Sequence, residues 1–311
     1  MTLSFLFSLI ISLLRAIIGI TFFTLFERKI LGYIQLRKGP NKVGFIGLPQ
    51  PIADAIKLFT KEHLQPFKIN VTPFIIAPII ALTLSSIIWI LCPNTNPFFY
   101  ITYSVIIFIT ISRINVYTPL IAGWASNSKY ALLGSLRRLA QTISYEITLT
   151  LIILSTLLIY SSFIFYNINL QIFINLSRML PHLLLIWFIS ILAETNRAPF
   201  DFAEGESEIV SGFNIEYNSS GFALLFIAEY IIILVIRIIT VTLFFTLLLT
   251  NTWSQINLSI NRTFYAFLFV WTRGSLPRIR YDHLIYLTWK RFLPTTLCII
   301  IRIITLIELL F

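Results

Sequence analysis

The chain has 311 residues, of which 57% are hydrophobic and only 12% are charged. This composition is typical of an integral membrane protein and excludes the two soluble domains that the length alone would suggest. The net charge of +10 does not indicate nucleic-acid binding, because Lys and Arg are scattered between apolar runs and form no single basic face or tail.

Eight membrane spans are predicted from the apolar runs, since a bilayer core needs about 20 apolar residues per helix. They cover residues 3–26, 74–92, 98–120, 138–162, 172–194, 221–250, 256–273 and 292–311. The fifth and seventh have the weakest patterns, because Arg178 and His182 interrupt one and Arg262 interrupts the other. The predicted fold class is an all-α polytopic membrane protein with a single membrane domain over residues 1–311.

Basic residues predict how the chain is oriented. Eight spans place both termini on one side and leave four loops on the other, at about 28–72, 121–138, 195–219 and 273–291. These loops and their borders hold 17 of the 23 Lys and Arg residues. The positive-inside rule therefore places them on the inside, which in a mitochondrion is the matrix side.

The first inside loop is predicted to contain an amphipathic helix from Pro51 to about Glu62, because proline favours the first turn of a helix. Ile52, Ile56 and Phe59 share one face, while Asp54, Lys57 and Lys61 share another. Such a helix would lie along the membrane surface. A solvated amphipathic linker is the alternative.

Carboxylates are concentrated in the stretch from Ala193 to Tyr217, which joins the fifth and sixth spans. It carries six of the chain's 13 acids: Glu194, Asp201, Glu204, Glu206, Glu208 and Glu216. We call residues 195–217 the acidic loop. Acids so concentrated beside apolar spans favour a functional explanation.

Three further carboxylates lie in or at the end of spans: Glu27, Glu146 and Glu229. A charge within a span costs roughly 2.5–3.5 kcal/mol, so each must face a partner or a wet cavity. Arg138 precedes Glu146 by eight residues and Arg237 follows Glu229 by eight, so these cations are predicted as their partners. Several carboxylates linked by water are what a proton path requires. The alternative is that each acid pairs with an Arg to fix helix packing.

No cofactor motif is present in the sequence. Cys92 and Cys298 lie far apart, and neither belongs to a CxxC motif or a Cys/His cluster, so no iron–sulfur, zinc or other metal site is expected. GxGxxG and GxxxxGK[ST] are also missing, so no dinucleotide or phosphate loop is predicted. If the chain takes part in redox chemistry, other chains hold the cofactors.

Four blocks resemble a known family. They are FERKILGYIQLRKGPNKVGFIGLPQPIADAIKLFTKE at 26–62, GWASNSKYALLGSLRRLAQTISYE at 123–146, the acidic loop, and WTRGSLPRIRYDHLIYLTWKRFLP at 271–294. Together they are similar to subunit 1 of NADH:ubiquinone oxidoreductase, respiratory complex I, over nearly the whole chain. The resemblance implies a core membrane subunit that is not catalytic alone and that couples quinone reduction to proton translocation.

The resemblance also implies roles for individual residues. The wall and entrance of a quinone chamber would involve Arg28, Arg37, Asp54 and Lys57. An acidic proton path would use Glu194, Asp201, Glu204, Glu206, Glu208, Glu216, Glu229, Tyr145 and Glu146. Glu27 would belong to either set, and Arg197 would hold the acidic loop in register. The family pattern usually has small or apolar residues at the positions of Arg113, Arg138 and Arg237.

The implied substrate is ubiquinone, in a chamber shared with partner subunits, while flavin, iron–sulfur clusters and nucleotide would be bound by other chains. The implied partners are hydrophilic quinone-module subunits, small and antiporter-like membrane subunits, and lipid, with no nucleic acid. The implied location is the mitochondrial inner membrane, with the charged loops in the matrix.

Two other functions remain open from the residues alone. A stand-alone proton- or cation-coupled transporter would also use intramembrane acids, but it predicts internal repeats, and the two halves show no convincing self-similarity. A structural scaffold would use its charges only to dock partners. The depth of Glu146 and Glu229 argues against a scaffold.

Overall fold

The computed structural model describes residues 2–92, 101–170, 176–201, 212–214, 216–245 and 252–310. These residues form helices and connecting segments, and no strand occurs among them. Six helical stretches within them are long and apolar enough to cross a membrane: Leu6–Ile34, Val71–Ile90, Ser104–Ala125, Lys129–Tyr160, Ser219–Phe244 and Tyr281–Leu309. The all-α membrane fold is confirmed, whereas the number of eight spans is not.

The fifth predicted span differs because of a proline. Its described part consists of the single turn α8 (Leu176–Met179) and of α9, which begins at Pro181 and ends at Glu194. The proline ring disfavours helical dihedral angles at the preceding residue, and Leu180 has φ −131° and ψ 67°. Fourteen residues extend only about 21 Å, which is less than the roughly 30 Å of a bilayer core.

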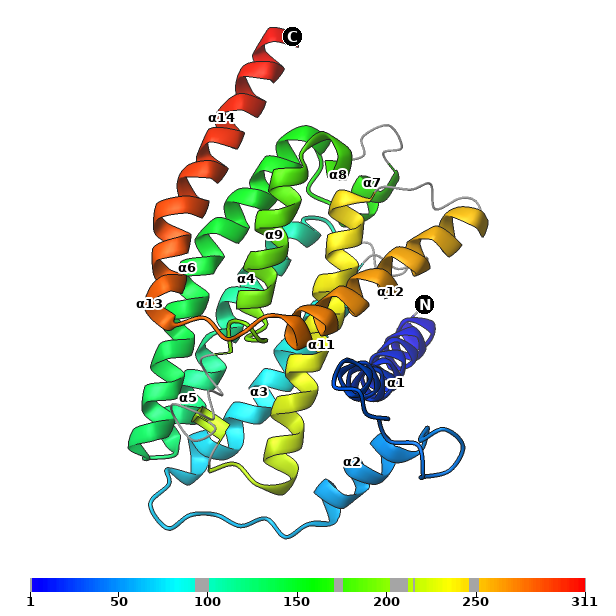
Figure 1. The fold of residues 1–311 in the computed structure, drawn as a ribbon, viewed down its shortest axis with the longest axis vertical. Coiled ribbons are helices and arrows are strands. Elements are labelled where there is room, and N and C mark those ends of the chain that lie inside the picture. Colours follow the sequence, from blue (N-terminus) through cyan, green and yellow to red (C-terminus); the bar gives the residue numbers. More distant parts are fainter. Residues whose placement is uncertain are drawn as a thin grey trace.

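The seventh predicted span differs because of its composition. Helix α12 (Thr252–Ser275) has 24 residues and is long enough to cross a bilayer. Asn257, Asn261 and Arg262 interrupt its apolar sequence, so α12 is not among the six apolar stretches. Figure 1 shows α12 crossing α11 obliquely.

Two long helices organise the bundle (Figure 1). Helix α6 (Lys129–Tyr160) packs against α5 (Tyr117–Ala125), α9 and α14 (Leu293–Leu310). Helix α11 (Ser219–Phe244) packs against α3 (Val71–Ile90), α12 and α1 (Thr2–Ile34). The remaining elements are α4 (Ser104–Asn115), α7 (Phe165–Leu170), α13 (Tyr281–Leu287), a π-helical turn (Thr288–Phe292) and the 3-10 turn η2 (Gly212–Asn214).

A buried tyrosine joins the two organising helices. Tyr145, Tyr160 and Trp187 are among the largest fully buried side chains in the described residues. The hydroxyl of Tyr160 on α6 donates to the carbonyl of Leu243 on α11 at 3.0 Å. This contact satisfies a polar group inside an apolar core and fixes α6 relative to α11.

Helix α2 (Gln50–Thr60) confirms the amphipathic helix predicted after the first span. It lies at the bottom of the molecule in Figure 1, in contact with α1 and α11, and none of its residues is fully buried. Its neighbours α1 and α11 enclose a cavity with it.

A glycine lets the end of the acidic loop approach α6. A Cβ atom added at Gly134 would lie 3.0 Å from Gly212 Cα and 3.1 Å from Phe213 N, both backbone atoms. We expect Gly134→Ala to lower stability by about 1–3 kcal/mol, the usual cost of overpacking, seen as a lower thermal inactivation temperature of the assembled complex. Gly19→Ala on α1 is the control, because its Cβ would meet only the flexible end of Leu234, at 3.3 Å. Equal effects in both variants would contradict the close approach.

Candidate functional site

The main cavity lies between α1, α2 and α11 and has a volume of about 540 Å³. Most of its wall is apolar, with Ile17, Ile20, Leu31, Leu58, Phe226 and Ile227 among the lining residues. Charged and polar side chains also line it: Glu27, Arg28, Asp54, Tyr230 and Arg273. The cavity can therefore hold an elongated apolar molecule that carries a polar group.

Helix α2 turns one face toward this cavity. Pro51, Asp54, Ala55 and Leu58, spaced i, i+3, i+4 and i+7, line the cavity. Ile52 and Ile56 point elsewhere and are 57% and 58% exposed. Helix α2 thus presents polar and apolar side chains to the cavity, Leu58 and Phe59 among them, while Ile52 and Ile56 remain uncovered by this chain.

An ion pair joins α1 to α2 at the cavity wall. Arg28 Nη1 donates to Asp54 Oδ2 at 2.5 Å, and Gln50 Nε2 donates to Asp54 Oδ1 at 3.0 Å. The side chains of Arg28 and Asp54 are 54% and 35% exposed, so solvent screens the pair and its contribution to stability is small. Its effect is to orient two predicted chamber residues toward each other.

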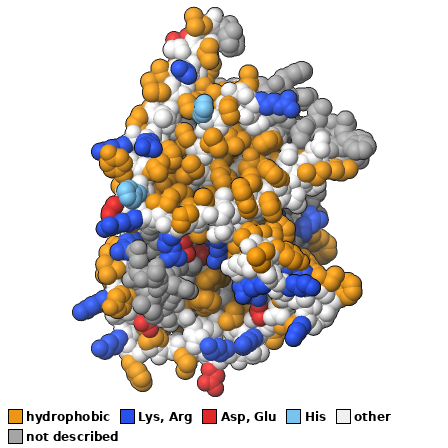
Figure 2. All heavy atoms as spheres, viewed as in Figure 1, with side chains coloured by type: hydrophobic (Ala, Val, Ile, Leu, Met, Phe, Trp, Pro, Cys, Tyr) orange, Lys and Arg blue, Asp and Glu red, His pale blue; other side chains and the backbone are white. Residues whose placement is uncertain are grey.

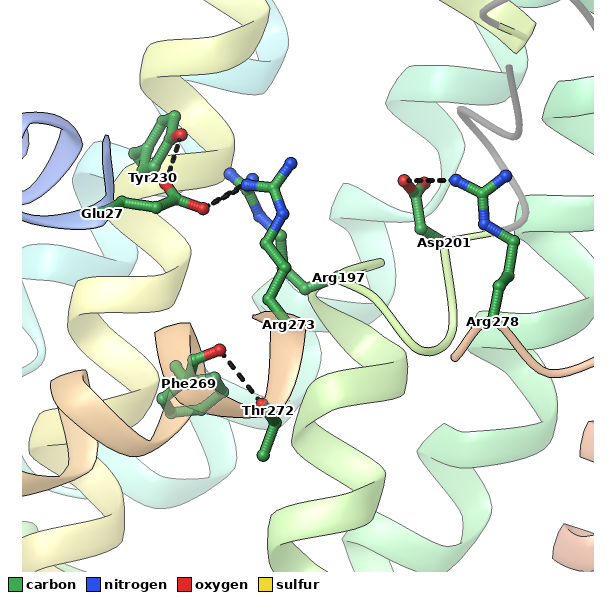
Figure 3. A network of polar contacts seen from close by, with 8 residues as sticks. All are labelled: Glu27, Arg197, Asp201, Tyr230, Phe269, Thr272, Arg273 and Arg278. Atoms are coloured by element: carbon green, nitrogen blue, oxygen red, sulfur yellow. Dashed lines mark hydrogen bonds and ion pairs between the residues drawn. The ribbon is translucent and has the colours of Figure 1, made fainter. Parts of the chain in front are cut away.

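A buried network surrounds Glu27, which is 6% exposed (Figure 3). The hydroxyl of Tyr230 donates to Glu27 Oε2 at 2.7 Å, and Arg273 Nη1 donates to Oε1. Arg197 Nη1 lies 3.7 Å from the same Oε1, and its guanidinium lies 4.5 Å from the centre of the Tyr230 ring. One carboxylate on α1 thus connects α11, α12 and the start of the acidic loop.

The first residues of the acidic loop are held at several points. Asp201 forms an ion pair with Arg278 at 3.5 Å, which Figure 3 shows beside the Glu27 network. Gln141 Nε2 on α6 donates to the carbonyls of Ala193 and Phe200 at 2.9 and 2.8 Å. The loop therefore begins in a fixed position against α6 and the segment after α12.

The other end of the loop is held by Tyr217, which stacks on Phe74 of α3 with ring centroids 4.1 Å apart. Its hydroxyl donates to the Phe74 carbonyl at 3.0 Å. Burial raises the pKa of the Tyr217 hydroxyl, so this group stays a hydrogen-bond donor. Glu216 beside it is partly exposed.

A second, small cavity of about 30 Å³ brings two carboxylates together. Arg138, Glu194 and Glu229 line it, with Ser112, Asn115, Thr142 and Thr195 as further polar neighbours. Arg138 Nη1 donates to Glu229 Oε1 at 2.7 Å, from α6 to α11. The volume is enough for at least one water molecule, which needs roughly 10–15 Å³.

The predicted partners of the buried acids were wrong. Arg138 pairs with Glu229 and not with Glu146, because eight residues along a helix separate two side chains by about 12 Å, whereas a neighbouring helix brings one into contact. Glu229 is therefore paired with Arg138 and not with Arg237, whose charge is repelled by that of Arg262 on α12. The charge of Glu146 is attracted by Arg113 and repelled by Glu194.

Three buried polar atoms of the predicted proton path lack a hydrogen-bond partner among the described residues: Tyr145 Oη, Glu146 Oε1 and Glu194 Oε2. Tyr145 is fully buried. Buried polar atoms without a partner are costly, and water or a neighbouring chain is the usual way to satisfy them. These three groups are candidates for contacts that change during function.

The chain is similar to known proteins over nearly its whole length. The family model described as NADH dehydrogenase matches residues 7–304. The chain belongs to the NADH dehydrogenase family. NADH-ubiquinone oxidoreductase chain 1 of Heterololigo bleekeri is 48% identical over 302 residues, which is 97% of this chain and 96% of that protein. The chain 1 proteins of Aedes aegypti and Osphranter rufus are 50% and 46% identical, each over at least 94% of both chains.

In this member of the NADH dehydrogenase family, the structure brings together only some of the predicted residues. Glu27, Arg28 and Asp54 line the main cavity, and Glu194 and Glu229 line the small one. Arg37 and Lys57 are exposed and do not line the main cavity. Glu204, Glu206 and Glu208 lie outside the described residues.

Sequence reasoning did not single out Tyr230 and Arg273 as site residues. Tyr230 directly follows Glu229, and Arg273 was counted only among the loop charges. A signal for Tyr230 was available, because a polar ring beside an intramembrane acid within an apolar helix needs a hydrogen-bond partner. Nothing in the sequence pairs Arg273 with Glu27, which lies 246 positions away.

Proposed function

We propose that this chain is the chain 1 membrane subunit of NADH:ubiquinone oxidoreductase, and that it forms the entrance and wall of the quinone chamber. Its family and the names of its relatives support the first part. The 540 Å³ cavity between α1, α2 and α11 supports the quinone-chamber proposal, because its wall is mostly apolar but also contains charged side chains.

The cavity suits ubiquinone in its two chemical parts. The isoprenoid tail needs an apolar surface, which Ile17, Leu58 and Phe226 provide from three helices. The head group needs hydrogen-bond donors and charge to guide it, and Arg28, Asp54 and Tyr230 line the same cavity. Reduction of the head group requires electrons from cofactors in partner subunits, so this chain binds and orients the substrate.

A second part of the proposal concerns proton translocation. Reduction of the quinone changes the charge beside Glu27, whose network includes Arg197 at the start of the acidic loop. The loop begins next to Glu194, which interacts electrostatically with Glu146 and shares a small polar cavity with Glu229. We infer that the route is formed by Glu27, Asp201, Glu194, Tyr145 and Glu146, with Glu204, Glu206, Glu208 and Glu216 of the loop. Glu229 borders the route as the ion-pair partner of Arg138.

The proposed setting is the mitochondrial inner membrane, with the charged loops in the matrix and with hydrophilic, small and antiporter-like subunits as neighbours. Figure 2 supports one orientation, because most Lys and Arg side chains on the visible face lie in its lower half, on the side where Figure 1 places α2. Cationic loops remain on the inside of a membrane.

Filling the main cavity tests the quinone assignment. Ala55 lines the cavity, whereas Ala53 on the same helix is exposed and does not line it. We expect Ala55→Trp to lower kcat/KM for a long-chain quinone about tenfold, because the larger side chain occupies space in the cavity. An overpacking cost of 1–3 kcal/mol corresponds to a roughly five- to 150-fold lower rate constant. Ala53→Trp should leave it within about twofold. Equal kcat/KM values in the two variants of the assembled complex would exclude this cavity as the quinone site.

A further inference from the structure

Arg138 is a buried cation that is held from two sides. Its guanidinium donates to Glu229 on α11 at 2.7 Å, and it lies 4.9 Å from the ring centre of Phe213 in η2. The Arg138 and Glu229 side chains are only 10% and 15% exposed. Gly134, one turn earlier on α6, is the residue that lets η2 approach. Arg138 therefore connects three elements: α6, α11 and the end of the acidic loop.

The two carboxylates of the small cavity differ in their partners. Glu229 has an arginine within hydrogen-bond distance, whereas Glu194 Oε2 has no hydrogen-bond partner among the described residues. Among the described residues, Arg138 is the only cation that lines the cavity shared by Glu194 and Glu229. The charge of Arg138 is thus paired with Glu229 and not with Glu194.

We propose that Arg138 is a positioning residue that keeps Glu229 as the fixed member of an ion pair, while Glu194 across the same cavity is the group that passes the proton. Arginine does not release its proton in proteins, so the pair has a permanent cation and no proton of its own to give. A buried pair is strongly disturbed when one partner is removed, but much less when both become neutral. This inference rests on the proposed proton route.

Neutralising the two partners separately and together tests the proposal. In the assembled complex, Arg138→Gln and Glu229→Gln should each lower NADH-driven proton pumping about tenfold, because each leaves one buried charge without its partner. The double variant R138Q/E229Q should recover to within about twofold of the unmodified complex. Arg138→Lys keeps the charge and should retain more pumping than Arg138→Gln, even where Arg138→Gln assembles poorly. Pumping is normalised to assembled complex on native gels.

Two results would overturn the proposal. If R138Q/E229Q pumps as poorly as Glu229→Gln alone, Glu229 itself transfers protons. If Arg138→Gln alone pumps normally, Arg138 has no positioning role. The Glu194→Gln variant tests the proton route independently of Arg138. Normal pumping in that variant would contradict the route, whatever the Arg138 and Glu229 variants show.

Discussion

Replacing Glu27 by glutamine is expected to destabilise the contact between α1, α11 and α12 and to reduce the amount of assembled complex. The carboxylate is almost completely buried and accepts from Tyr230 and Arg273, with Arg197 at 3.7 Å. Neutralising it leaves cations without their anion, which typically costs 3–5 kcal/mol for a buried pair. We expect about 3 kcal/mol, because the Arg273 side chain is 37% exposed and solvent compensates it in part.

The measurement is the thermal inactivation temperature of the complex together with its abundance on native gels. Asp282→Asn is the matched control, since Asp282 forms an ion pair with Arg280 at 3.0 Å, but both side chains are more than 70% exposed. Exposed pairs contribute about 0–1 kcal/mol. A Glu27→Gln complex as stable as the Asp282→Asn complex would show that the network in Figure 3 does not hold these helices together.

Replacing Glu194 by glutamine is expected to give the largest loss of proton pumping, at least about tenfold, with normal assembly. Glu194 ends α9 directly before the acidic loop and interacts electrostatically with Glu146. Glutamine has nearly the same shape but cannot exchange a proton. We expect Glu146→Gln to lower coupled turnover as well, because both acids belong to the same proposed route.

Proton uptake and quinone reduction should be followed in proteoliposomes that contain the complete complex. Glu308→Gln is the control, because Glu308 is an exposed acid on α14, outside both cavities. Normal pumping and normal quinone reductase rates in Glu194→Gln would contradict the proposed route, and the same result in Glu146→Gln would exclude Glu146 from it.

The sequence was sufficient for the fold class and for α2. The six long apolar helices coincide with apolar runs in the sequence. Helix α2 coincides with the amphipathic pattern that begins near Pro51. The number of spans was less predictable from the sequence. Counting apolar residues does not reveal that Pro181 starts a new helix, nor how far the Asn and Arg residues of α12 lower its hydropathy.

The sequence singled out acids that line the two cavities of the candidate site, but not the cations that pair with them. Acidic residues within apolar spans stand out in a sequence, because placing a charge in a membrane costs free energy. Glu27, Glu194 and Glu229 all line cavities. Their cations come from other helices, as Arg138 does for Glu229 and Arg273 for Glu27. Spacing along one helix gives no information on such contacts, which depend on how α6, α11 and α12 pack.

The most direct test of the account is to label native membranes with a photoreactive ubiquinone, isolate the NADH-oxidising complex on a native gel, and map the labelled peptides. The account predicts label in this chain, on α1, α2 and α11 around the 540 Å³ cavity, and loss of that label with excess ubiquinone. Label confined to other chains or to distant segments such as α14, or this chain running apart from the NADH-oxidising complex, would contradict it.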